Sequence, residues 1–139
     1  MSDIKQISAT SAYEMIKNKP QTVFVDVRSS MEFLFVGHAK GSNSIPWIDE
    51  PDWKIDPHFA THIRQLTLGG AHSSDEEGVP IILICRSGHR SLEAGIHLIK
   101  EGFEDVYNID TGFEGDLDEN HHRGTLGGWR FEGLPWEQG

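Results

Sequence analysis

The chain has 139 residues, enough for one domain that buries its own core. Its 22 acidic side chains outnumber its 12 basic ones and give a formal net charge of −10, which argues against nucleic acid and anionic membranes as partners. The single cysteine excludes an internal disulfide. Because the N-terminal segment lacks the basic and apolar regions of a signal peptide, and no apolar run approaches the ~20 residues of a membrane helix, we expect a cytoplasmic protein.

The N-terminal part of the chain is predicted to form a strand, a helix and a second strand. Residues 4–8 alternate weakly between polar and apolar side chains, as in a short strand. Residues 12–19 have a helical pattern, which Ser8 or Ser11 can cap. The β-branched and apolar residues 22–27 predict a buried strand.

The middle of the chain is predicted to form two helices around a short strand. Residues 29–37 predict a short amphipathic helix that ends at Gly37. Residues 41–48 predict a short strand that runs into a proline-containing loop. Residues 56–70 predict a longer helix with Asp56 at its N-cap and one apolar face.

The most apolar segment, residues 81–85, predicts a strand at the centre of a sheet. A polar loop with an acidic run, residues 71–80, precedes it and is expected to be solvated. A helix over 90–102 and a short strand over 106–109 follow. Strands that alternate with helices predict an α/β domain with a parallel sheet, and the sites of such sheets lie at the carboxyl ends of the strands.

The last part of the chain is rich in glycine and has no sustained period. We therefore divide the chain into a main domain over 1–115 and a C-terminal extension over 116–139. The extension is expected to pack on the same domain through aromatic side chains rather than to be disordered, and the candidate anchors of the tail are Phe113, Trp129, Phe131 and Trp136.

Cys85 ends the central strand and so lies at a carboxyl end, as do Asp26 and Arg28. A thiol is nucleophilic only when ionised, and a strand–turn–helix junction stabilises an anion through its amides and the N-terminus of the following helix. In the sequence CRSGHRS, two arginines and a histidine add positive charge, and the glycine lets the turn close into a ring of inward N–H groups. These features predict a reactive thiolate beside a bound anion rather than a small apolar core residue.

CRSGHRS is preceded in the chain by VFVDVR and EFLFVGHAKGSNSIP and followed by GFEDVYNIDTGFEGD. In this order the four segments resemble the active-site loop and the flanking signatures of rhodanese-homology (sulfurtransferase) domains, with Ala39 and Ser42 as mild departures. The resemblance covers roughly residues 4–115. It implies a three-layer α/β fold with a central parallel sheet of about five strands and helices on both faces.

The resemblance also implies the activity of a thiosulfate sulfurtransferase (rhodanese), in which Cys85 is the nucleophile and carries sulfur as a persulfide. The donor would be a small anion such as thiosulfate, and the acceptor cyanide, a small thiol or a protein; no metal or organic cofactor is implied. The residues that would bind substrate or brace the loop are Arg86, Ser87, Gly88, His89 and Arg90. A supporting role is implied for Ser91, Asp26 and Arg28.

Two other functions stay open. Cysteine phosphatases and arsenate reductases use similar anion cradles, but their loops resemble Cys-x5-Arg, and here only four residues separate Cys85 from Arg90. A shorter ring suits a terminal sulfur and crowds a tetrahedral phosphate. The third possibility is a protein-binding module without activity, although such domains often lose the cysteine that this chain keeps.

Several further residues are expected to be structural. The histidine pairs lack the extra ligands of a metal site, so solvated positions are expected for His58, His62, His121 and His122. His38 matches a family position and is expected to be structural. Trp47 either lines the rim of the pocket or packs in the core.

Overall fold

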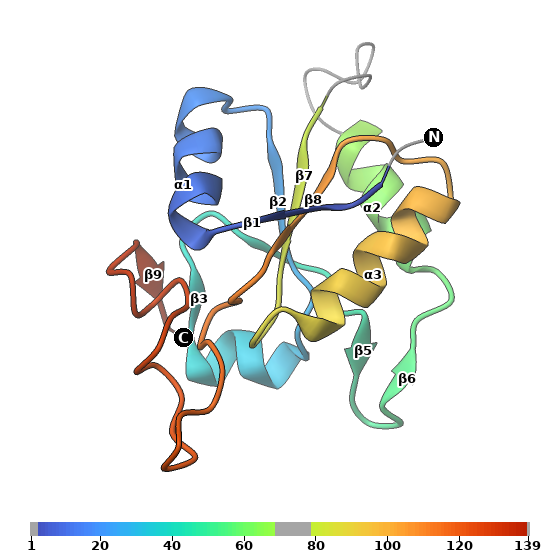
Figure 1. Cartoon of the computed structure of the whole chain (residues 1–139). Helices are drawn as coiled ribbons and strands as arrows, with labels where there is room; N and C mark the ends of the chain where they lie inside the picture. The colour runs from blue at the N-terminus through green and yellow to red at the C-terminus, as the bar shows by residue number, and fades with distance from the viewer. Residues whose placement is uncertain (1–2, 69–78, 139) are drawn as a thin grey trace.

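The computed structural model describes residues 3–68 and 79–138 and is built around one five-stranded sheet. Most of its strands are labelled in the middle of the ribbon in Figure 1. The strand order is β1-β8-β7-β2-β4, and every pair of neighbours is parallel. The five strands are β1 (Lys5–Ile7), β2 (Val23–Asp26), β4 (Asn43–Ser44), β7 (Ile81–Ile84) and β8 (Val106–Ile109). The predicted parallel sheet of about five strands is therefore confirmed, with the most apolar strand, β7, at its centre.

Helices cover both faces of the sheet (Figure 1), as predicted. On one face, α2 (Phe59–Leu68) and α3 (His89–Lys100) pack on a cluster that includes Val23, Val25 and Leu83. On the other face, α1 (Ala9–Asn18) packs on Phe24 and Ile82. Successive side chains of a strand point to opposite faces, which is why a strand buried on both sides is apolar throughout.

The polar residue that caps α1 is Ser8, whose Oγ accepts a hydrogen bond from the backbone N–H of Ser11 at 3.1 Å. The helix consequently begins at Ala9, three residues earlier than the apolar pattern predicts. In α2, Asp56 caps the first turn, since its Oδ1 accepts from the N–H of His58 at 2.8 Å. Both caps satisfy amides that have no partner within their own helix.

Residues 29–37, for which we expected a short amphipathic helix, form a different structure. Its regular part is a short π-helix, η1 (Glu32–Val36), which ends at Gly37 with φ 113°. None of its residues is fully buried, and Phe35 is 67 % exposed. The apolar residues of this segment therefore contribute less to the core than their spacing predicts.

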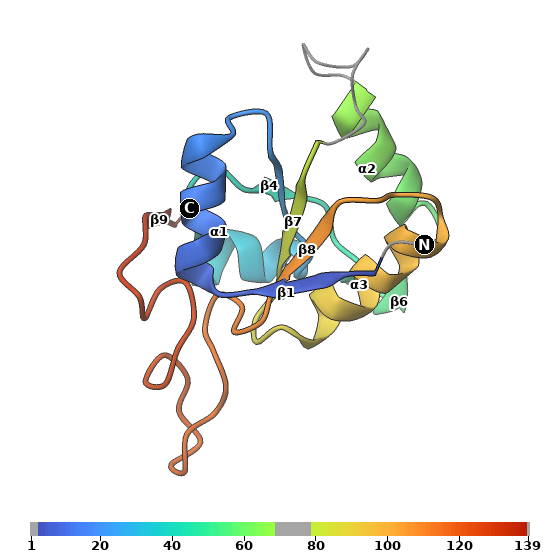
Figure 2. The ribbon, with the colours of Figure 1, turned by 45° about the horizontal axis from the view of Figure 1, so that its top comes forward.

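Two small antiparallel sheets flank the main one. β5 (Ile48–Asp49) pairs with β6 (Lys54–Ile55), and β3 (His38–Ala39) pairs with β9 (Trp136–Glu137). The second pairing brings the C-terminal segment to the side of the sheet that α1 covers (Figure 2). Two-residue strands have no sequence period, so only the predicted strand over 41–48, which became β4 and the start of β5, was found in advance.

Trp129 anchors the C-terminal segment. Its side chain is 1 % exposed, lies 5.8 Å from the ring of Tyr13 and 5.2 Å from that of Phe24, and its indole N–H donates to Pro135 O at 2.7 Å. Phe113 is buried in the same cluster, whereas Phe131 and Trp136 are exposed. Two of the four aromatic anchors that we expected therefore lie in the core.

The acidic part of the predicted polar loop, residues 73–77, lies outside the described residues. Across residues 3–68 and 79–138, the helices are all too short or too polar to cross a lipid bilayer.

Candidate active site

Cys85 lies at the end of β7, where the chain turns into α3. Its side chain is 1 % exposed, yet two polar groups approach the sulfur. The N–H of Gly88 donates to Cys85 Sγ at 3.1 Å, and Ser91 Oγ lies 3.1 Å from the same atom. Gly88 adopts φ 101°, a left-handed conformation that glycine accepts at no steric cost and that turns its N–H toward the sulfur.

The ring of inward N–H groups predicted for the loop is only partly present. In the described part of the chain, the Gly88 amide is the single backbone donor to the sulfur. The sulfur is nevertheless not enclosed by apolar atoms alone, because the Gly88 amide and the Ser91 hydroxyl both face it. The Gly88 amide can only donate and so favours an anionic sulfur, whereas the Ser91 hydroxyl can either donate to the sulfur or accept from the thiol.

The segment after β8 holds the turn in place through its backbone. Phe113 N–H donates to Cys85 O at 2.7 Å, and Glu114 N–H donates to Arg86 O at 2.9 Å. Gly112 makes this approach possible, because a Cβ at its position would lie 2.6 Å from the Arg86 backbone. The close approach of the two backbone segments thus explains why a glycine stands at position 112, after the last strand of the main sheet.

Arg90 does not extend freely toward solvent; it forms a bidentate ion pair with Glu32 of η1. Its Nη1 and Nη2 lie 2.7 Å and 2.9 Å from the two carboxylate oxygens. Partial burial alone would raise the pKa of Glu32, but the hydrogen bonds and charge of Arg90, together with hydrogen bonds from Ser29, lower that pKa to about 2. The same pairing raises the pKa of Arg90. Arg90 is therefore placed to brace the turn against η1.

Asp26 and Arg28 form a second, fully buried ion pair beside the turn. Arg28 Nη2 lies 2.7 Å from Asp26 Oδ2 and 2.5 Å from Gly37 O, and the guanidinium stacks 4.7 Å from the ring centre of Phe113. The pair thus joins the end of β2 to the end of η1 and to the segment after β8. This position favours the supporting role over contact with substrate.

The remaining loop residues differ in their exposure. Arg86 and His89 are exposed, and Ser87 is partly buried. Within residues 3–68 and 79–138, Arg86 forms no ion pair, so its charge is available to an anion that approaches the turn. Of the two loop arginines that were candidates for binding the donor, the geometry favours Arg86.

Two residues that contact the Cys85 turn or the start of α3 were not found from the sequence. Glu32 pairs with Arg90, and Asn108 of β8, which is 0 % exposed, contacts Ser91 and Gly88. Glu32 had a signal, since Ser29 and Glu32 form a capping box in which Ser29 N–H and Glu32 N–H each donate to the other's side chain at 3.2 Å. Asn108 also had one: a polar residue inside an apolar strand must find partners when it is buried.

The other residues singled out in the sequence have structural contacts. Trp47 is buried against Phe59 and His97, so it packs in the core rather than lining a rim. His38 stacks on Phe33 with ring centres 3.8 Å apart. Among the side chains that the structure describes, no cluster of three or more His, Cys, Asp or Glu is placed to hold a metal ion.

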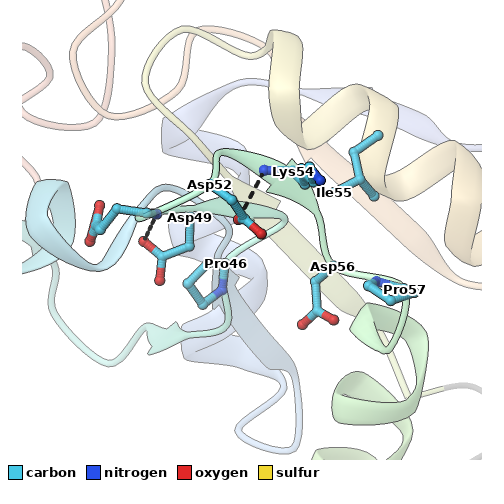
Figure 3. Close-up of a pocket in the computed structure, with 8 residues that line it drawn as sticks. Pro46, Asp49, Asp52, Lys54, Ile55, Asp56 and Pro57 are labelled. Carbon is cyan, nitrogen blue, oxygen red and sulfur yellow. Dashed lines mark hydrogen bonds between the residues drawn. The ribbon is translucent and has the colours of Figure 1, made fainter.

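An open pocket of about 530 Å³ lies around the β5–β6 hairpin, and its lining does not include the Cys85 turn (Figure 3). Acidic residues dominate the lining, with Lys54 as its single cation: Pro46, Asp49, Glu50, Asp52, Lys54, Ile55, Asp56 and Pro57. Such a lining repels anions, so the pocket is not a second site for an anionic sulfur donor.

Comparison with known proteins agrees with this geometry. Residues 8–119 match the family model described as the rhodanese-like domain. The chain belongs to the rhodanese-like family. The match includes the Cys85 turn, the Asp26–Arg28 pair and the segment that holds the turn after β8.

The rhodanese-like fold is shared along almost the whole chain with the crystal structure of Rv0390 from M. tuberculosis, at a TM-score of 0.82 and 35 % identity, covering 99 % of this chain and 100 % of that one. The thiosulfate sulfurtransferase GlpE of Pseudomonas putida is 32 % identical over 82 % of this chain and 86 % of its own. The uncharacterized protein RC0915 of Rickettsia conorii is 28 % identical over 96 % of this chain and 98 % of its own.

Proposed function

We propose that this rhodanese-like chain is a sulfurtransferase that carries sulfane sulfur on Cys85 as a persulfide. The observation that carries the proposal is the pair of polar groups aimed at the buried sulfur, the Gly88 N–H and the Ser91 hydroxyl, each 3.1 Å from Cys85 Sγ. The similarity to GlpE, whose name states a thiosulfate sulfurtransferase, supports the same reaction class.

The reaction needs no external oxidant or reductant. The Cys85 thiolate attacks the outer sulfur of a donor such as thiosulfate, the donor's sulfur–sulfur bond breaks, and sulfite leaves with the electron pair. The enzyme then holds a Cys85 persulfide anion. A nucleophilic acceptor such as cyanide or a thiolate attacks the outer sulfur, and the Cys85 thiolate is released for the next cycle.

The burial of Cys85 suits a persulfide because the sulfur that is transferred is the outer one. A sulfur–sulfur bond is about 2 Å long, so a persulfide would extend the reactive atom beyond the position of Cys85 Sγ. We assign its negative charge to the turn amides of residues 86–90 and to the N-terminus of α3. Arg86, which is exposed, is the residue that we assign to the anionic oxygens of the donor.

The direct test is to incubate the purified protein with thiosulfate and measure its intact mass. We expect an increase of one sulfur atom, located on Cys85 by peptide mapping, and its loss as thiocyanate when cyanide is added. Cys85→Ser should fold normally and acquire no sulfur. A variant without the thiol that still forms thiocyanate would end the proposal.

Two further assays separate the alternatives. Hydrolysis of an aryl phosphate or reduction of arsenate, with no persulfide formed, would favour the cysteine phosphatase or arsenate reductase class instead. Absence of every one of these activities in folded protein would favour a binding module. We propose the cytoplasm as the location of the activity, as expected from the sequence.

A further inference from the structure

The side-chain amide of Asn108 has one chemically allowed orientation. Its Nδ2 lies 3.1 Å from Gly88 O and 2.7 Å from Gln6 Oε1. The carbonyl oxygen of Gly88 can only accept a hydrogen bond, so the end of the amide that faces it must be the NH₂ group. The other end, Oδ1, therefore faces Ser91 Oγ, which lies within hydrogen-bonding distance.

The Ser91 hydroxyl thus has two neighbours and only one hydrogen. Asn108 Oδ1 is purely an acceptor, so the hydroxyl must donate to it. The contact between Ser91 Oγ and Cys85 Sγ then has to be made by the thiol, whose S–H donates to the hydroxyl oxygen. The chain of donors runs from the Cys85 thiol to Ser91 and from Ser91 to Asn108.

Ionisation of Cys85 breaks this arrangement. A thiolate has no hydrogen to donate, so the hydrogen bond to Ser91 can persist only if the hydroxyl turns its own hydrogen toward the sulfur. Asn108 Oδ1 then loses its donor. It cannot turn away, because Nδ2 is held by two acceptors, and Asn108 is 0 % exposed, so bulk water does not reach it.

We propose that Asn108 is a positioning residue that sets the reactivity of Cys85 by competing with the sulfur for the single hydrogen of the Ser91 hydroxyl. The thiol proton goes to solvent base, the hydroxyl turns to the sulfur, and no redox step is involved. The competition favours the neutral thiol when no substrate is bound. This inference rests on the proposed role of Cys85 as nucleophile, but it concerns a hydrogen bond that exists without any sulfur donor.

The other charged and titratable groups around the turn stay unchanged in the variants that test this. They are Arg86 and His89 in or next to the turn, Arg90 of α3 with Glu32 of η1, the Asp26–Arg28 pair at the end of β2, and Asp110 and Glu114 after β8. A change in the reactivity of the sulfur can therefore be assigned to the hydroxyl and its partner.

The experiment measures the rate of alkylation of the only thiol by iodoacetamide across a range of pH, with no sulfur donor present. In Ser91→Ala the thiolate loses a donor, so the half-maximal rate should occur at higher pH, and the rate near neutral pH should fall about five-fold. In Asn108→Ala the hydroxyl is free for the sulfur, so the half-maximal rate should occur at lower pH. In the double variant the profile should match Ser91→Ala alone.

The direction of the pH shift in Asn108→Ala distinguishes competition for the hydroxyl hydrogen from simple support of the turn. If Asn108 acted only by holding the Gly88 peptide, Asn108→Ala would shift the profile to higher pH and would do so equally in the Ser91→Ala background. A shift of Asn108→Ala to higher pH, or an equal shift in the Ser91→Ala background, overturns the proposal. Thr67→Val is the matched control, because it removes another buried hydroxyl, one that donates to Arg64 O in α2 at 2.9 Å, and should leave the profile unchanged.

A second measurement does not depend on the folding of an Asn108 variant. The infrared S–H stretching band of the single thiol should lie at the lower frequency of a donating thiol, and it should move to higher frequency in Ser91→Ala. A band at the position of a free thiol in the unmodified protein, or one that Ser91→Ala leaves in place, would show that Ser91 donates to the sulfur from the start and would overturn the proposal.

Discussion

Glu32 and Arg90 show how one ion pair can connect the stability of the fold to its candidate site. Both side chains are about three-quarters buried and aligned in a bidentate pair. Losing either partner leaves the other charge partly desolvated, which costs more than the pair itself contributes. Two predictions follow from this at the level of single residues.

The first prediction concerns the free energy of unfolding at acidic pH. The folded state lowers the pKa of Glu32 from 4.5 to about 2, so the pair stabilises the protein fully above about pH 4.5, and the contribution is lost as the pH falls toward 2. Wild-type protein should therefore lose about 2 kcal/mol from this group between about pH 6 and pH 3. Urea denaturation at the two pH values should show a smaller loss in Glu32→Gln.

Glu14→Gln is the matched control for this measurement. Glu14 also pairs with a cation, Lys17 at 3.5 Å, but its side chain is 62 % exposed. It should therefore change the pH dependence of the unfolding free energy very little. An equal effect of the two substitutions would contradict a special role for the Glu32–Arg90 pair.

The second residue-level prediction separates the two loop arginines. Arg90→Ala leaves the Glu32 carboxylate unpaired, so we expect the free energy of unfolding to fall by about 2 kcal/mol. Arg86→Ala removes an exposed charge and should leave unfolding unchanged within about 0.5 kcal/mol, but raise the KM for thiosulfate several-fold. Thermal unfolding and steady-state kinetics on both variants check this; the reverse assignment of the two effects would refute it.

The sequence predicted the position of the candidate nucleophile but not every residue around it. Cys85 was predictable because polar residues and glycine crowd the end of the most apolar segment. The partner of Arg90 was not, since Glu32 is far away in the sequence and pairs only after η1 docks against the turn. The contacts of Asn108 were not predictable for a similar reason. Its position inside an apolar strand indicates that it is buried, but no local pattern tells which residues it contacts.

At the scale of elements, the turn between β7 and α3 depends on Gly88. Its φ of 101° disfavours any side chain, and a Cβ there would collide with the backbone oxygen of Asp110. Gly41 has a similar φ of 88°, but nothing lies within 4 Å of a Cβ at its position. Substitutions at Gly41 and Gly88 therefore distinguish the cost of a left-handed backbone alone from the added cost of a steric collision.

We expect Gly41→Ala to cost about 1–2 kcal/mol, the strain of the left-handed conformation alone. Gly88→Ala should cost clearly more and should also slow alkylation of Cys85, because the displaced Gly88 N–H no longer donates to the sulfur. Chemical denaturation and thiol labelling measure the two effects. Equal costs for the two variants would mean that the turn adapts to a side chain.

The longer elements were predictable from periodicity, and the shorter ones were not. The strand at 106–109 and the central strand match β8 and β7, because apolar and β-branched residues dominate them. η1 was misjudged: its apolar spacing suggests an inner face, yet Met31, Leu34 and Phe35 are exposed. Val36 packs on the core, and polar contacts add to the docking of η1, through Glu32 and through Ser30 just before it, whose hydroxyl donates to Asp49 Oδ2 at 2.6 Å.

For the whole molecule, the division of the chain at residue 115 stays a prediction that the position of Trp129 makes testable. Trp129 covers Phe24 on the face of the sheet shared with α1. Trp129→Ala should therefore cost about 3–5 kcal/mol, a value typical of a buried aromatic side chain. Phe131→Ala, at a side chain that is 49 % exposed, should cost less than about 1 kcal/mol in the same denaturation experiment.

Deletion of residues 116–139 extends this prediction. Without Trp129, the side of the sheet that carries Phe24 and Ile84 loses part of its cover. We expect the shortened chain to bind a hydrophobic dye and to unfold without a sharp transition. A shortened chain that keeps a cooperative transition at an unchanged temperature would show that the extension only decorates a complete domain.

The order of the strands also governs when this protein can assemble on the ribosome. β1 is made first, but its partner in the sheet is β8, and Lys5 pairs with Tyr107. β2 likewise waits for β7, and Phe24 stays without Trp129 until residue 129 has left the exit tunnel. We therefore expect the strand edges to stay open during translation and the sheet to be completed only after β8 has emerged.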